Sequence, residues 1–136
     1  KKNETMEFTA LRNELQQAVA QAEEYAISNL QESITFSPYI FLGEKNIRKI
    51  LADNIDKAIE TAQEEIEDLT QETVVFVYSD VVKLADGECN VIVTQLFNED
   101  EDNGYSYGLL YKIENNKITF SNQRVFLGNI RNCLIF

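Results

Sequence analysis

The hydrophobic periodicity changes once along the chain, near Leu69, and this change limits the fold to helices first and strands afterwards. Before Leu69, apolar residues recur every three or four positions, which is typical of amphipathic helices. After it they alternate with polar residues, which is typical of strands that bury one face. We therefore predict a single α+β domain that covers residues 1–136.

The helical part divides into two segments, at about residues 4–31 and 44–69. Between them, Pro38 and Gly43 interrupt a stretch of β-branched and aromatic residues, which we interpret as an extended connector. Both segments carry bases toward their starts and acids toward their ends, so an antiparallel arrangement brings opposite charges together. We predict an antiparallel helical hairpin, although a partner protein that recognises these charges would explain the pattern equally well.

Four strands are predicted between about residues 73 and 128, with short connections between them. Asp86-Gly87 and Asn115-Asn116 are typical of two-residue hairpin turns, which join antiparallel neighbours. We expect a four-stranded antiparallel meander with the helical hairpin packed on one face. The last residues of the chain could add a short fifth strand.

The predicted turns set a register that places a polar band across an otherwise apolar sheet face. This register assumes that Phe97 lies opposite Tyr105, so that the paired residues share the face covered by the helices. The candidate ligand-binding residues of this band are Tyr78, Asp80, Gln95, Tyr107, Asn122 and Arg124. Arg124 would hold an anion, and the tyrosines would form the walls of a cleft. Alternatively the band is hydrated at an open end of the sheet, or the register is displaced by one residue.

Four consecutive acids in the segment NEDEDNG, residues 98–104, raise the question of a metal ion. A calcium-binding EF-hand loop needs glycine at its sixth position and glutamate at its twelfth. Neither a start at Asn98 nor a start at Asp100 satisfies this pattern. We predict no metal site here, and interpret the acids as a solvated hairpin tip that discourages pairing between sheet edges.

The residue types exclude several kinds of active site. The chain has no histidine, which excludes Ser-His-Asp and Cys-His catalysis, histidine-bound zinc and histidine-bound haem. Its two cysteines, Cys89 and Cys133, form no C-x-x-C motif and are expected to be buried thiols. Catalytic residues stay unknown, no cofactor is expected, and an enzyme is disfavoured without being excluded.

Net charge disfavours two classes of partner. The chain has 12 basic and 23 acidic residues, giving a net charge of −11, whereas nucleic acids and anionic membranes need clustered bases. A basic protein partner suits this charge better, unless the acidity only maintains solubility. No apolar run could span a bilayer and no signal-peptide pattern is present, so we expect a cytoplasmic protein. The start at Lys1 leaves open a trimmed N-terminus.

These observations favour a small acidic, non-catalytic interaction domain that binds a protein partner or a second copy of itself. A second sheet face that stays half apolar supports this prediction. The alternative is a small-ligand-binding domain or an enzyme with a polar cleft between helices and sheet. A concave pocket with Arg124 facing into it would favour the alternative, and an exposed apolar patch would favour the interaction domain.

Overall fold

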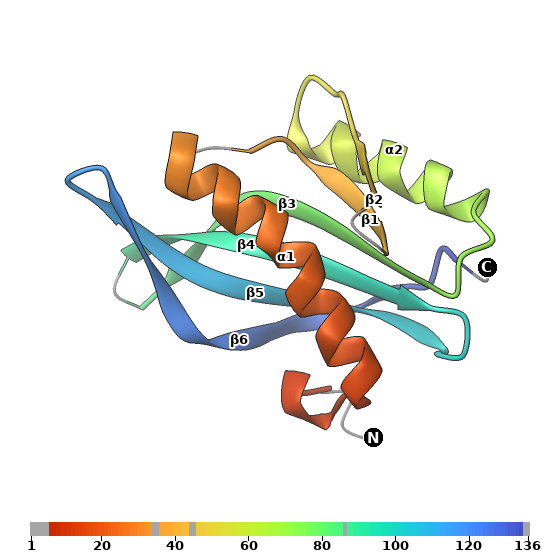
Figure 1. Cartoon of the computed structure of the whole chain (residues 1–136). Coiled ribbons are helices and arrows are strands. Elements are labelled where there is room, and N and C mark those ends of the chain that lie inside the picture. The colour runs from red at the N-terminus through yellow and green to blue at the C-terminus, as the bar shows by residue number, and fades with distance from the viewer. Residues whose placement is uncertain (1–5, 34–35, 44–45, 86, 135–136) are drawn as a thin grey trace.

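One antiparallel sheet of six strands separates two helices in the computed structural model (Figure 1). The structure describes residues 6–33, 36–43, 46–85 and 87–134. Its elements in chain order are η1 (Phe8–Ala10), α1 (Asn13–Ser33), β1 (Tyr39–Gly43), β2 (Asn46–Lys49), α2 (Ile55–Glu67), β3 (Thr73–Leu84), β4 (Gly87–Asn98), β5 (Asn103–Glu114) and β6 (Lys117–Arg131). The strand order is β2-β1-β3-β4-β5-β6, so the expected meander continues into an additional hairpin, β1–β2.

The predicted helical hairpin is wrong, because α1 and α2 pack on opposite faces of the sheet. On one face, α1 covers a core that includes Val75, Val77 and Tyr107. On the other face, α2 covers a second core that includes Val74 and Phe76. The physical reason lies in β3, whose residues 74–78 are all buried. A continuous apolar run is typical of a strand covered on both faces. A helical hairpin on one face would leave the apolar residues of the other face exposed.

The second predicted helix, 44–69, is wrong in its first half. Residues 46–49 form β2, which pairs with β1, and the extended connector predicted before it contains β1. The helix begins only at Ile55, after Asn54, whose side-chain oxygen accepts a hydrogen bond from the Lys57 N–H at 2.9 Å. Such a capping interaction fixes where a helix begins. The apolar residues Ile47 and Ile50 imitate helical spacing while lying in and after an extended strand.

The strand registers explain which residues face which helix. Leu84 pairs with Gly87 instead of Cys89, a displacement of two residues that leaves the facing of β3 and β4 unchanged. Tyr105 pairs with Leu96 instead of Phe97. This displacement of one residue turns the aromatic residues of β5 toward α1.

The hairpin β5–β6 begins as predicted and then departs from a regular ladder. Asn115 and Asn116 have φ values of 52° and 64°, and Tyr111 pairs with Phe120 as expected. Leu109 then pairs with Arg124, so β6 has two additional residues opposite this step. A second irregularity follows beside Gly128, whose φ is 145°. Bulges of this kind increase local twist and redirect side chains, and α1 accordingly contacts both β1 and β6.

The chain end differs from the expected fifth strand. β6 runs on to Arg131, and the described residues after it, 132–134, form no strand. Cys133 is instead buried in the core beneath α2. Neither described helix combines the length and apolarity that a bilayer-spanning segment requires.

Candidate functional site

The six residues of the predicted polar band do not share one face. Tyr78 lies in the core under α2, and Gln95, on the neighbouring strand, points to the same side of the sheet. Tyr107 and Arg124 lie on the α1 side. The displaced register between β4 and β5 separates the two pairs. A role for any of these residues in binding a ligand stays a prediction.

The two remaining members of the band are Asp80 and Asn122. Asp80 is exposed, and its carboxylate accepts a hydrogen bond at 2.8 Å from the N–H of the next residue, Val81. The side chain of Asn122 lies outside the described part of the structure. Asp80 and Arg124 therefore form no pair, as their positions on different faces require.

Arg124 binds an acid that the sequence analysis did not identify, Glu23 of α1. The Arg124 Nε donates to both carboxylate oxygens of Glu23, at 3.0 and 2.9 Å, and a terminal nitrogen also donates to Oε1. The guanidinium lies 4.5 Å from the ring centroid of Phe8. Glu23 is 1% exposed, and burial raises its pKa more than the Arg124 hydrogen bond and charge lower it. This pair fastens α1 to β6.

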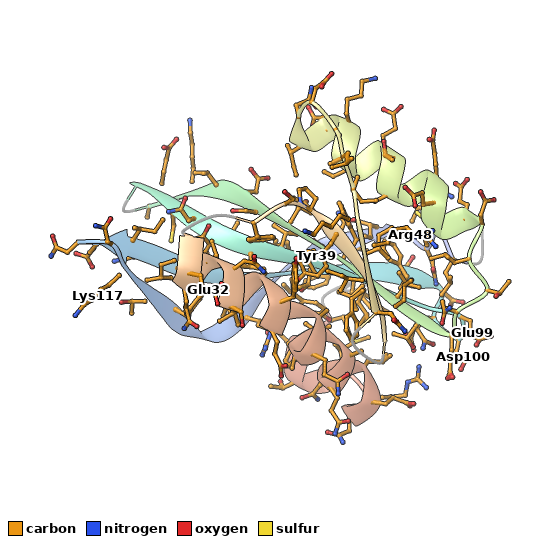
Figure 2. The ribbon with its side chains drawn as sticks, turned by 45° about the horizontal axis from the view of Figure 1, so that its top comes forward. Glu32, Tyr39, Arg48, Glu99, Asp100 and Lys117 are labelled. Atoms are coloured by element: carbon orange, nitrogen blue, oxygen red, sulfur yellow. The ribbon has the colours of Figure 1, made fainter. Side chains whose placement is uncertain are left out.

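Two tyrosines complete the attachment of the N-terminal segment. The Tyr107 hydroxyl donates to the backbone carbonyl of Met6 at 2.8 Å. Tyr39, labelled in Figure 2, donates its hydroxyl to the Ala22 carbonyl and accepts from the Ala26 N–H at 3.0 Å. Burial raises the pKa of both phenols above the ordinary value, so both stay neutral donors.

Tyr78 and Gln95 form a smaller polar group beneath α2. Burial, followed by the charge of Asp80, raises the pKa of Tyr78 to about 12, while a hydrogen bond from the Gln95 side chain lowers it. The Oε1 of Gln95 is buried and has no hydrogen-bond partner in the described structure. At neutral pH the phenol stays protonated, so this pair offers no general base.

The acidic connection between β4 and β5 is fastened by hydrogen bonds to its backbone and to the side chain of Asn98. The Asn98 side-chain oxygen accepts from the Asp100 N–H at 2.8 Å and from Arg12 at 3.1 Å. The Asn132 amide donates to the carbonyls of Asn98 and Glu101, at 2.9 and 2.8 Å. Within the described residues, no three side chains of the ligand types histidine, cysteine, aspartate and glutamate come together as a metal site. These hydrogen bonds hold the connection in a defined turn.

Residues 104–108 read Gly-Tyr-Ser-Tyr-Gly, which matches the letters of the nucleophile motif G-x-S-x-G. The match has no catalytic context, because the segment lies inside β5 and the chain has no histidine to activate Ser106. The two glycines serve packing. A Cβ on Gly104 would come within 2.8 Å of Ile130, and a Cβ on Gly108 within 2.6 Å of Val91.

The exposed side of α2 carries many charged residues, most of them acidic. Its buried side consists of Ala58, Ala62 and Ile66. Its exposed residues and the exposed acids at its two ends are Asp53, Asp56, Lys57, Glu60, Glu64, Glu67 and Asp68. Two arginines contact this helix, Arg48 at Glu65 (3.2 Å) and Arg131 at Glu67 (2.7 Å). We call this surface the acidic side of α2.

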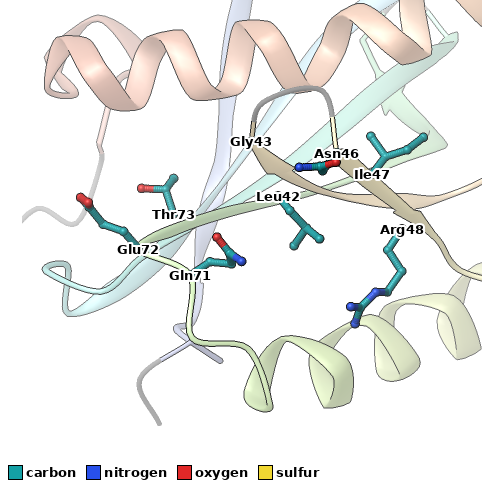
Figure 3. A pocket seen from close by; sticks show the side chains of 8 residues that line it. All are labelled: Leu42, Gly43, Asn46, Ile47, Arg48, Gln71, Glu72 and Thr73. Carbon is teal, nitrogen blue, oxygen red and sulfur yellow. The ribbon is translucent and has the colours of Figure 1, made fainter.

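An open groove lies beside the C-terminal end of α2 (Figure 3). Its volume is about 680 Å³, within the range of sites that hold small molecules or peptide segments. Its lining residues are Leu42, Gly43, Asn46, Ile47, Arg48, Gln71, Glu72 and Thr73. Sequence reasoning missed this groove because it assigned residues 44–69 to one helix and therefore had no β1–β2 hairpin to form a wall.

The edge strand β6 has few exposed large apolar side chains among its described residues. Val125 and Leu127 of β6 are 40% and 42% exposed, on a part of the sheet that α2 does not reach.

Comparison of the chain with protein-family models, with curated proteins and with solved structures finds no match.

Proposed function

We propose that this chain is a non-catalytic interaction domain that binds a basic protein partner through the acidic side of α2. The observation that carries the proposal is the composition of that side, with a single base, Lys57, among six acids. The last turn of the helix contains no base. A complementary positive surface would be attracted to this side and oriented by it.

The charge pattern of α2 opposes the stability of the helix itself. Asp56, Glu60 and Glu64 follow one another at intervals of four residues, where each like-charged pair costs about 0.2–0.5 kcal/mol. Acids in the last turn also oppose the helix dipole, at about 0.3–1 kcal/mol each. A surface optimised for stability alone would carry bases there. The destabilising pattern supports a role outside folding, in binding a cation-bearing partner.

A second copy of the chain is a poorer occupant of this side than a basic protein. Two acidic sides brought face to face would place like charges together without compensation. The same repulsion applies to nucleic acid and to anionic membranes. The distribution of charge thus supports a partner whose surface is rich in lysine or arginine.

Neutralising two acids of α2 tests this function. Glu60→Gln/Glu64→Gln should weaken the binding of poly-lysine about tenfold, or about 1.4 kcal/mol, at physiological ionic strength. The same variant should be more stable than the parent by about 0.4–1 kcal/mol, because like-charge repulsion is removed. Titration calorimetry and urea unfolding measure the two effects.

The matched control removes the same charge from the other helix. Glu24 and Glu32 are exposed on α1, which lies on the opposite face of the sheet (Glu32 is labelled in Figure 2). Glu24→Gln/Glu32→Gln should leave poly-lysine binding within about twofold of the parent, which is about 0.4 kcal/mol. Equal weakening by the two double variants would mean that only net charge matters, and would refute a specific role for α2.

A further inference from the structure

The groove beside α2 exists because the sheet separates between β1 and β3. These strands pair only over Tyr39–Phe41 and Val75–Val77. Continued pairing would place Gly43 opposite Thr73, but the pairing with β3 ends at Phe41. At the same point the pairing of β1 with β2 shifts between Phe41 and Gly43, and φ of Gly43 is 94°. β3 nevertheless stays a strand back to Thr73, where it pairs with β4 on its other edge. One edge of β3 therefore borders the groove at this residue.

The backbone of Thr73 points into this groove. The Glu72 carbonyl accepts a hydrogen bond from the Glu99 N–H at 2.9 Å, so the backbone groups of Glu72 point toward the β4 side. Successive residues of a strand direct their backbone groups to opposite edges. The N–H and C=O of Thr73 consequently point toward β1, in the direction where the ladder with β1 is not formed. This is the arrangement that an added strand requires.

The surroundings of the groove favour a positively charged occupant. Glu72 lines it, and the exposed acids Glu64 and Asp68 lie at the end of α2 next to it. The C-terminal end of a helix adds a partial negative charge of its own. The one described cation in the lining, Arg48, is already paired with Glu65. Leu42 on the α2 side and Ile47 on the α1 side add apolar surface to the two sides of the groove.

We infer that the groove binds an extended basic peptide segment of the partner, which adds as a short strand along β3 at Thr73. The inference rests on the proposed function and names the element of the partner that is recognised. The peptide backbone exchanges hydrogen bonds with the N–H and C=O of Thr73. Its side chains alternate between the two faces of the sheet, so that apolar residues contact Ile47 on the α1 side while basic residues reach Glu72 and the end of α2 on the other side.

A short peptide of alternating lysine and valine is the probe for this inference. Two peptides serve as controls: one of alternating glutamate and valine, and one with the probe's own sequence but with N-methylated backbone amides, which cannot donate. On binding of the probe, the amide of Thr73 should shift in NMR spectra and exchange its hydrogen at least about tenfold more slowly. The two control peptides should bind at least about tenfold more weakly than the probe.

A matched pair of variants blocks the groove or leaves it open. Asn46→Trp places a large side chain in the lining, at an exposed position of β2. Thr119→Trp makes a comparable change at an exposed position of β6, outside the groove. The first should weaken binding of the probe about tenfold, and the second should leave it unchanged. If Asn46→Trp does not fold, the N-methylated peptide tests backbone pairing on the unaltered chain.

The outcomes separate the inference from the proposed function. Equal binding of the probe and its N-methylated form, or an unprotected Thr73 amide, would overturn the strand addition. If the strand addition fails in this way but Glu60→Gln/Glu64→Gln still weakens binding of the probe, the proposed function of α2 stands. If this double variant also leaves binding of the probe unchanged, both the strand addition and the proposed function are overturned.

Discussion

Replacement of Arg124 by alanine is expected to lower the free energy of unfolding by about 3–5 kcal/mol. The change leaves the Glu23 carboxylate under α1, 1% exposed and without the cation that its burial requires. It also removes the contact between the guanidinium and the ring of Phe8. Urea unfolding followed by circular dichroism measures the loss.

Two control variants show that the loss comes from the unpaired charge. Arg124→Met combined with Glu23→Leu removes both charges, and should restore stability to within about 2 kcal/mol of the parent. Arg124→Lys keeps the charge but cannot donate two hydrogen bonds in the same plane, so its loss should be intermediate. A loss below 1 kcal/mol for Arg124→Ala would mean that Glu23 is hydrated in solution, contrary to its burial here.

Replacement of Ile66 by alanine should cost about 2–5 kcal/mol. Ile66 is fully buried, and the other fully buried residues of α2, Ala58 and Ala62, are small. A helix of 13 residues is marginal without tertiary contacts, so α2 should separate from the sheet before the rest of the fold opens. Hydrogen exchange should show lost protection in α2 and retained protection in α1.

Ile59→Ala is the control on the same helix. Ile59 is only partly buried against the same core, so its replacement should cost clearly less than that of Ile66. Loss of protection in both helices together after Ile66→Ala would contradict the separate placement of α1 and α2 on the two faces. It would instead support direct contact between the helices.

The four strands of the meander were predictable from the sequence, whereas the hairpin β1–β2 and the layers were not. The change of period near Leu69 and the Asn115-Asn116 turn located the strands of the meander to within a few residues. The error came from the apolar run of β3, residues 74–78, which was interpreted as having one buried face. A strand buried on both faces needs two covering layers, and this required α1 and α2 to lie apart.

The candidate site depended on one register that the sequence could not determine. The connection of residues 98–104 contains no defined two-residue turn, so the opposition of Phe97 and Tyr105 was an assumption. A displacement of one residue then turned every side chain of β5 to the other face. The bulges of β6 are likewise invisible in a pattern of alternation, although they determine where Arg124 points.

One signal for the partner of Arg124 was present in the sequence. Glu23 follows Val19 by four residues and precedes Ala26 by three and Leu30 by seven, so it lies within the apolar stripe of α1. An acid inside such a stripe needs a buried partner. Its position within the stripe, and not its charge alone, predicts this buried ion pair.

The placement of the helices is the central claim, because the acidic side of α2 and the groove beside it follow from it. Methyl–aromatic NOE spectroscopy tests this placement most directly. We expect NOEs from the methyl groups of Ala62 and Ile66 to the ring of Phe76, and from those of α1 to the ring of Tyr39. NOEs between methyl groups of α1 and α2, with none from α2 to Phe76, would restore the helical hairpin and contradict the account.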